Sequence, residues 1–129
     1  MSALHGQSIL IVEDEPLIAV DMHAALSETG ASIIAALNRH EALLAAANAE
    51  ISAAILDIKL GGCDCSLVCT ALTRRHVPFM FYTGYRNDDV RKVWPWAPLL
   101  VKPATREQLL TYVLRLLKKH TTMLRGKMH

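Results

Sequence analysis

The sequence has few cysteines. There are three, Cys63, Cys65 and Cys69, and an odd number in one short segment is a poor framework for disulfides. They could form a thiol metal site, but none of the six histidines lies beside them. Reduced cysteines near a helix start are therefore the favoured interpretation, and this usage is typical of a reducing compartment.

The sequence also lacks a long hydrophobic run. No apolar stretch reaches the roughly 18 residues that a membrane helix needs. Residues 1–8 do not have the basic-then-apolar pattern of a signal peptide. We therefore expect a cytoplasmic protein with no membrane insertion.

The sequence also has no large excess of positive or negative charge. Fourteen basic and twelve acidic residues leave a formal net charge of +2, whereas a DNA-binding domain usually has a strongly basic face. No glycine-rich phosphate loop follows the first predicted strand, which argues against a nucleotide-binding protein. We expect neither nucleic acid nor a nucleotide as a partner.

The length and composition predict a single domain. The 129 residues are 52% hydrophobic and 20% charged, and they contain no internal repeat or low-complexity linker. A chain of this size can bury one core of its own. We expect one domain over residues 1–129, with its core at about 8–120 and a short basic tail at 121–129.

Apolar runs alternate with segments of helical character five times. The predicted strands are residues 8–12, 31–36, 53–56, 78–82 and 99–101. The predicted helices are residues 17–30, 41–49, 66–75, 87–93 and 106–120. Five strand-helix units predict an α/β fold with a parallel sheet, right-handed crossovers and helices on both faces.

Polar residues follow four of the predicted strands. They are Glu13-Asp14, Asp57, Thr83-Gly84 and Lys102-Pro103. Because the carboxyl ends of parallel strands lie side by side, we expect these residues to meet in one crevice, where open α/β sheets bind ligands. Singly, Asp14 would be a helix cap, Asp57 a turn residue and Lys102 a surface charge. Their recurrence at successive strand ends favours a site.

This set of residues suits phosphoryl transfer to an aspartate. Mg²⁺ prefers oxygen ligands and commonly uses one or two carboxylates together with a phosphate. Asp57 is a candidate nucleophile because aspartyl phosphates are established covalent intermediates. Mg²⁺ and Lys102 could neutralise the charge of the transferred group, and Gly84 would leave room for it.

These residues and their spacing resemble the receiver domain of two-component response regulators. The resemblance extends over nearly the whole chain, from Ile9 to about Leu117, and rests on the strand-end residues given above together with strand 53–56. It implies a flavodoxin-like fold, a doubly wound (βα)5 sandwich whose five-stranded parallel sheet has the order 2-1-3-4-5.

The resemblance implies a metal site and a phosphorylation site. Asp57 would accept the phosphoryl group, and Asp14 and Asp57 would bind Mg²⁺ directly. Glu13 would act through water, and the backbone carbonyl of Lys59 would complete the protein ligands.

By the same resemblance, two further residues would hold the phosphoryl oxygens. The phosphoryl group would draw in the Thr83 hydroxyl and the Lys102 ammonium, and the Lys102-Pro103 peptide bond would be cis. This movement would reshape the surface that contains Trp94 and Trp96, at least one of which we expect to pack against the last helix.

Phe81-Tyr82-Thr83-Gly84-Tyr85 is similar to the motif of the FATGUY subgroup of receivers, which are often stand-alone proteins. Tyr82 stands where that subgroup has alanine, and Leu99 stands where many receivers carry a switch aromatic. Tyr85 either replaces that aromatic or is a partly buried packing tyrosine. The side chains of Lys59 and Tyr85 would flank the phosphoryl group and tune the access of water to it.

We expect a single-domain response regulator that takes phosphate from a sensor histidine kinase or phosphotransfer protein and docks a downstream protein. Relay intermediate, target-binding regulator and phosphate sink stay open, as does homodimer formation. We expect no enzymatic activity beyond self-catalysed phosphotransfer and autodephosphorylation. The alternatives are a phosphorylation-independent receiver-like binding module and, less favoured, a phosphatase with Asp57 as nucleophile.

Overall fold

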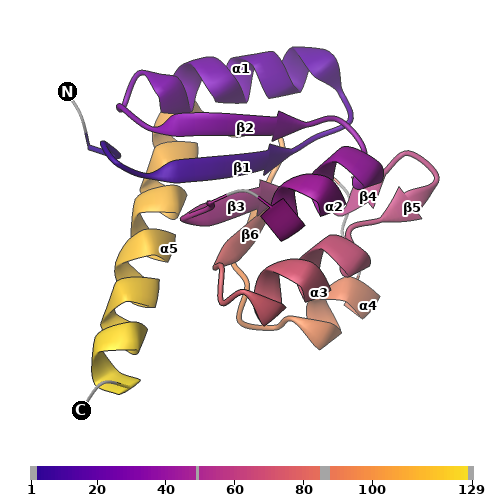
Figure 1. Cartoon of the computed structure of the whole chain (residues 1–129). Helices are drawn as coiled ribbons and strands as arrows, with labels where there is room; N and C mark the ends of the chain where they lie inside the picture. The colour runs from indigo at the N-terminus through magenta and orange to yellow at the C-terminus, as the bar shows by residue number, and fades with distance from the viewer. Residues whose placement is uncertain (1–2, 49, 85–87, 128–129) are drawn as a thin grey trace.

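A five-stranded parallel sheet runs through the centre of the molecule (Figure 1). The computed structural model describes residues 3–48, 50–84 and 88–127. The strands of this sheet are β1 (Ser8–Val12), β2 (Ser32–Ala36), β3 (Ala53–Leu56), β6 (Phe79–Thr83) and β7 (Leu99–Val101). Their spatial order is β2-β1-β3-β6-β7, with every pairing parallel. Numbered along the chain within this sheet, the order is 2-1-3-4-5, so the predicted flavodoxin-like α/β fold is confirmed.

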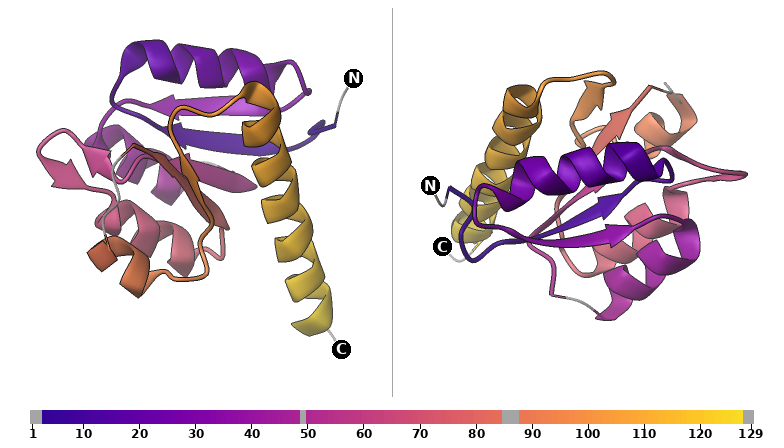
Figure 2. Two further views of the ribbon diagram at one scale, coloured as in Figure 1. Left: turned by 180° about the vertical axis from the view of Figure 1, so that it is seen from behind. Right: turned by 90° about the horizontal axis from the view of Figure 1, so that it is seen from above.

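Helices cover both faces of the sheet. They are α1 (Pro16–Ser27), α2 (Arg39–Asn48), α3 (Ser66–Arg74), α4 (Asp88–Val93) and α5 (Arg106–Lys127). Two separate apolar clusters fill the spaces between sheet and helices. One contains buried residues of α1 and α5, and the other contains buried residues of α2, α3 and α4. Figure 2 shows the same layers from behind and from above.

The central strands are apolar on both sides because both sides are covered. On β1, Ile9 and Ile11 pack in the cluster of α1 and α5, whereas Leu10 and Val12 pack in the other cluster. All four are fully buried. A strand with two covered faces reads as a continuous apolar run, which is why the short runs of the sequence predict these strands.

The structure contains a hairpin that the sequence did not predict. Strands β4 (Lys59–Leu60) and β5 (Cys63–Asp64) pair antiparallel after β3, with Leu60 opposite Cys63. Gly61 and Gly62 form the two-residue turn, and Gly61 has a φ of +64° that favours glycine. A Gly-Gly pair between two short strands is a signal for such a hairpin.

The last helix is longer than expected. It ends at Lys127, so most of the predicted basic tail at 121–129 is helical. The prediction was wrong because residues 121–125 contain neither proline nor glycine, and Gly126 comes only at the end of the helix. The C-terminal turns of α5 extend past the sheet (Figure 2).

The two tryptophans pack on the face opposite to the one expected. Trp94 is buried in the cluster of α2, α3 and α4, and its ring meets Phe79 edge-on at 6.3 Å. Trp96 is half exposed, with its ring centroid 4.7 Å from that of Phe79. Neither belongs to the cluster of α5, so the expected packing against the last helix is wrong. Both tryptophans contact Phe79, and alternate residues of β6 point to opposite faces of the sheet. Phe79 points to the face covered by α2, α3 and α4, so the tryptophans pack there.

Within the described residues, every helix is either too short or too polar to span a bilayer.

Two leucines on α3 provide a test of this packing. Leu72 has an exposed fraction of 0% and Leu67 one of 54%. We expect Leu72→Ala to lower the free energy of unfolding by about 2–5 kcal/mol, because it leaves a cavity in the core. Leu67→Ala, the same change on the same helix, should alter it by only about 0.5 kcal/mol. Urea denaturation measures both, and equal losses would contradict the assignment of α3 faces.

Candidate functional site

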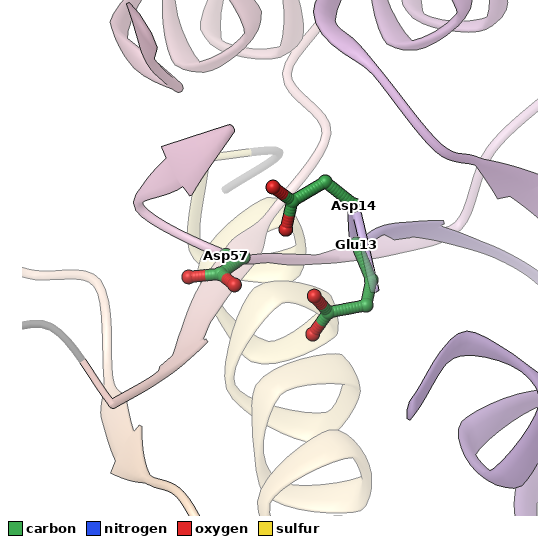
Figure 3. A group of neighbouring side chains, drawn as sticks. All are labelled: Glu13, Asp14 and Asp57. Carbon is green, nitrogen blue, oxygen red and sulfur yellow. The ribbon is translucent and has the colours of Figure 1, made fainter. Parts of the chain in front are cut away.

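The carboxyl ends of four strands bring the predicted polar residues into one place. Glu13 and Asp14 follow β1, Asp57 follows β3, Thr83 ends β6 and Lys102 follows β7. Figure 3 shows the three carboxylates turned toward a common point. One oxygen from each lies within 4.8 Å of the others. Parallel pairing of β1, β3, β6 and β7 produces this convergence, since it places all four strand ends at one edge.

Asp57 accepts hydrogen bonds on both carboxylate oxygens. The Thr83 hydroxyl donates to Oδ1 at 2.6 Å, and the Lys102 ammonium donates to Oδ2 at 2.9 Å. The backbone N–H of Lys59 lies farther away, at 3.4 Å from Oδ1. Asp57 has an exposed fraction of 7%, and a buried carboxylate of this kind needs such donors. Thr83 and Lys102 therefore both hold the Asp57 carboxylate.

Glu13 is the most buried acid of the site, with an exposed fraction of 1%. Its Oε1 forms an ion pair with Lys102 at 2.5 Å, and its Oε2 accepts a hydrogen bond from the Glu15 backbone N–H at 3.2 Å. Burial raises the pKa of Glu13 from 4.5 to about 7, against the opposing effect of the bond from Lys102. Nearby Asp57 adds a smaller upward contribution to this pKa.

Lys102 joins two of the three acids. Burial alone would lower the pKa of its ammonium, but the hydrogen bonds to Glu13 and Asp57 outweigh this effect and the pKa is raised. The lysine therefore stays charged at neutral pH. It supplies one positive charge to a cluster of three carboxyl groups.

Asp14 is held by the hairpin. Its Oδ2 accepts a hydrogen bond from the backbone N–H of Gly61 at 3.0 Å, across 47 positions of sequence. This bond was not predicted from the sequence. The Gly61-Gly62 pair was the available signal, but only the folded hairpin shows that one of its amides reaches Asp14.

A cleft of about 290 Å³ opens over these residues. Its lining residues are Asp14, Glu15, Asp57, Lys59, Gly61, Thr83, Gly84 and Lys102. A Cβ atom added at Gly84 would meet nothing within 4 Å, so this side of the cleft has the expected room. Lys59 lines the cleft, while Tyr85 lies outside the described residues.

The donors of the site fit a hard divalent cation. Glu13, Asp14 and Asp57 form the one group of potential metal ligands found among the described residues. All three offer carboxylate oxygens, which Mg²⁺ prefers. Asp14 is also only partly buried, which leaves the cluster open to solvent on its side. The three cysteines, by contrast, are free thiols, and a hydrogen bond with Cys65 together with burial raises the pKa of Cys69.

Two further expectations concern β7 and the residues after it. The Lys102-Pro103 peptide bond is cis, as the resemblance implied. Leu99 is partly buried and packs against the cluster of α2, α3 and α4, so an aliphatic side chain fills the position of the missing aromatic.

The fold and the site together define a flavodoxin-like domain with an acidic cluster at the carboxyl edge of its sheet. Residues 9–114 match the family model described as the response regulator receiver domain. The chain therefore belongs to the response regulator receiver domain family of two-component systems. Domains of this family generally bind a divalent metal at an acidic pocket and interact with histidine kinases or phosphotransfer proteins.

One curated relative is similar to this chain over part of its length. The transcriptional regulatory protein TcrA of Mycobacterium tuberculosis is 35% identical over 72 residues, which are 56% of this chain and 28% of that protein. The chain thus matches only about a quarter of the length of this curated relative.

Solved structures extend the comparison. A receiver domain protein from Methanospirillum hungatei has a TM-score of 0.82 at 24% identity, over 91% of this chain and 98% of its own. TrrA of Thermotoga maritima, solved in complex with Mg²⁺ and BeF, has a TM-score of 0.75 at 28% identity, over 85% and 98%. The likeness to the Methanospirillum hungatei protein shows that the two chains share the same fold.

The raised pKa of Glu13 predicts a pH-dependent stability without divalent metal. Between pH 4.5 and about 7 the folded state binds a proton that the unfolded state does not. The free energy of unfolding should therefore fall as the pH rises through this window, by an amount on the order of 1–3 kcal/mol. Denaturation in a chelator, at pH 5, 6 and 7.5, measures this fall.

Glu13→Gln is the control for this prediction, because glutamine cannot titrate. The difference between the two proteins isolates the contribution of Glu13 from that of the other acids. If both proteins show the same slope over this range, Glu13 does not titrate as described.

Proposed function

We propose that Asp57 accepts a phosphoryl group from the phosphohistidine of a sensor kinase or phosphotransfer protein, and that the chain signals this state by protein docking. The observation that carries the proposal is the environment of Asp57. One buried carboxylate has a hydroxyl donor on one oxygen, an ammonium on the other and two further acids beside it. The same donors could hold the oxygens of a phosphoryl group.

In this reaction a carboxylate oxygen of Asp57 attacks phosphorus. An O–P bond forms, the N–P bond of the phosphohistidine breaks, and its electron pair stays on the imidazole nitrogen. Hydrolysis by water returns the carboxylate and inorganic phosphate. Lys102 stabilises the negative charge on the transferred group, and Thr83 donates a hydrogen bond to it.

We propose that Glu13, Asp14 and Asp57, with the backbone carbonyl of Lys59, hold Mg²⁺. Asp14 and Asp57 would be direct ligands, and Glu13 would act through water. The ion, when bound, neutralises the phosphoryl oxygens and the repulsion among the carboxylates. The chemistry of the chain would be limited to transfer to its own Asp57 and to loss of that phosphate.

The contacts of Asp57 change the expected picture of the switch. We expected phosphorylation to draw in Thr83 and Lys102, yet both already contact the unmodified carboxylate. They would transfer their hydrogen bonds from carboxylate to phosphoryl oxygens. The free energy available for signalling is then the difference between the old and new bonds, which is smaller than the sum of two newly formed ones.

Phosphorylation can be tested with a small-molecule donor. On incubation with acetyl phosphate and Mg²⁺, we expect intact mass measurement to show one added phosphoryl group. A chelator should prevent the addition because the carboxylates and the donor would then repel each other. Asp57→Ala should gain none, whereas Asp64→Ala, which removes an exposed aspartate of the nearby hairpin, should gain as much as the native chain.

Failure of the native chain to gain phosphate would contradict the proposal. If it still bound its partner, the phosphorylation-independent binding module would be the better interpretation. Turnover of a generic phosphate ester beyond one equivalent would instead favour the phosphatase.

A phosphoryl analogue tests the two donors separately from the transfer step. Because TrrA was solved with Mg²⁺ and BeF, we expect this chain to bind the same pair. Lys102→Met should weaken that binding roughly 10- to 100-fold, since hydrogen bonds to charged groups contribute about 1.5–3 kcal/mol. Thr83→Ala should weaken it less, and Thr83→Ser should restore it.

Titration followed by ¹⁵N NMR measures this affinity. Lys119→Met, which removes an exposed lysine from α5, should bind as the native chain does. Native-like binding by Lys102→Met would show that its ammonium does not hold the phosphoryl oxygens.

A further inference from the structure

Tyr82 is a large aromatic residue beside Lys102, at the edge of the proposed phosphorylation site. It lies on β6, one residue before Thr83, and its exposed fraction is 8%. Alternate residues of a strand point to opposite faces. Tyr82 and Met80 therefore pack in the cluster of α1 and α5, and Phe79 and Phe81 pack in the other cluster.

The register of β6 and β7 brings Lys102 over this ring. Tyr82 pairs with Leu100, and Lys102 follows Leu100 by two residues, so it starts on the same face. The backbone N–H of Lys102 donates to the carbonyl of Thr83 at 3.0 Å, which fixes the start of the side chain. The ammonium then lies 5.7 Å from the centroid of the Tyr82 ring.

Lys102 lies between two hollows of the surface. It lines the acidic cleft, and it also lines a groove of about 290 Å³ between α1 and the residues after β7. We call this second hollow the α1 groove; Tyr82, Ile18, Met22, Pro103 and Leu109 are among its lining residues. A lysine has a long flexible stem, so its ammonium could in principle turn toward either hollow.

We propose that Tyr82 is a positioning residue for phosphoryl transfer, whose ring face restrains the Lys102 ammonium in its place beside Asp57. The inference rests on the proposed function and deepens it. An aromatic face attracts a cation through its quadrupole, most strongly where water is largely excluded. The ring adds a third contact for an ammonium that already bonds to Glu13 and Asp57.

This third contact matters most during transfer. Lys102 then has to exchange its bond to Asp57 for one to a phosphoryl oxygen, and for that time it has fewer fixed partners. The ring does not take part in the exchange, so it holds the ammonium throughout. Tyr82 touches neither the phosphoryl donor nor the reacting atoms and acts only through Lys102.

The rate of phosphorylation by acetyl phosphate tests the proposal. In the presence of Mg²⁺, Tyr82→Leu should slow the gain of phosphate by about three- to thirtyfold, the range expected for a cation–π contact. Tyr82→Phe keeps the ring face and should stay within about twofold of the native rate. Met80→Leu, on the same strand and in the same cluster, should also stay near the native rate. Equal rates for Tyr82→Leu and the native chain would overturn the inference.

A double-variant cycle separates positioning from general packing. If the ring acts through the ammonium, Tyr82→Leu should have no further effect on the rate once Lys102 is replaced by methionine. A packing defect would slow both backgrounds equally, and that result would overturn the proposal. Thermal unfolding of each variant confirms that the proteins compared are folded.

A measurement on the native chain needs no variant to fold. The ring current of Tyr82 should shift the NMR signals of the Lys102 side-chain protons upfield, and Tyr82→Phe should keep this shift. If the Lys102 signals show no upfield shift, the proposal is overturned. This result holds even if Lys102→Met gains phosphate too slowly for its rate to be measured. If the native chain gains no phosphate at all, the proposed function fails. If it gains phosphate and only the Tyr82 effects are missing, the positioning inference alone fails.

Discussion

The ammonium of Lys102 between Glu13 and Asp57 is the interaction on which the site depends. Three acids meet at one edge of the sheet, and two of them are buried. Buried charges of one sign are costly unless they are paired. Lys102 supplies that pairing, at 2.5 Å from Glu13 and 2.9 Å from Asp57. Without it, the parallel arrangement of β1 and β3 would bring together negative charges that repel each other.

The three acids are held in different ways. Asp57 is bonded by Thr83 and Lys102, Glu13 is bonded by Lys102 and the backbone, and Asp14 is bonded by the hairpin through Gly61. Burial raises the pKa of Glu13 to about 7, so the charge of the cluster depends on pH near neutrality. A divalent cation binds best to the fully ionised cluster. Binding of a metal at this cluster would therefore be linked to the ionisation of Glu13.

Lys102 also connects the site with the rest of the domain. Its backbone N–H is hydrogen-bonded to the carbonyl of Thr83, the residue lines the α1 groove, and its ammonium lies over the Tyr82 ring. A change at Asp57 that moves the Lys102 side chain would therefore also affect the α1 side of the sheet. Leu99, the first residue of β7, packs toward the other face. The two faces thus receive different residues of β7, and a signal through Lys102 need not involve an aromatic at position 99.

Much of the fold followed from local patterns. Short apolar runs predicted all five strands of the main sheet, because strands covered on both faces must be apolar throughout. The hairpin β4-β5 was missed, since four residues with a Gly-Gly turn give only a weak local signal. Helix α5 continues beyond its predicted end because residues 121–125 contain no proline or glycine that would stop it. The faces of Trp94 and Trp96 could not be read locally, as they depend on contact with Phe79 on another element.

The sequence by itself determined which chemical groups stand at the ends of the strands and, through its alternation of strands and helices, that those ends share one edge. Only the tertiary structure decided how these groups are paired. It showed Lys102 shared by two acids, Thr83 already bonded to Asp57, Asp14 bonded to a hairpin amide and Tyr82 beneath the ammonium. These contacts join residues far apart in the chain, and their distances and burial depend on sheet register and side-chain packing. No local pattern of residues contains that information.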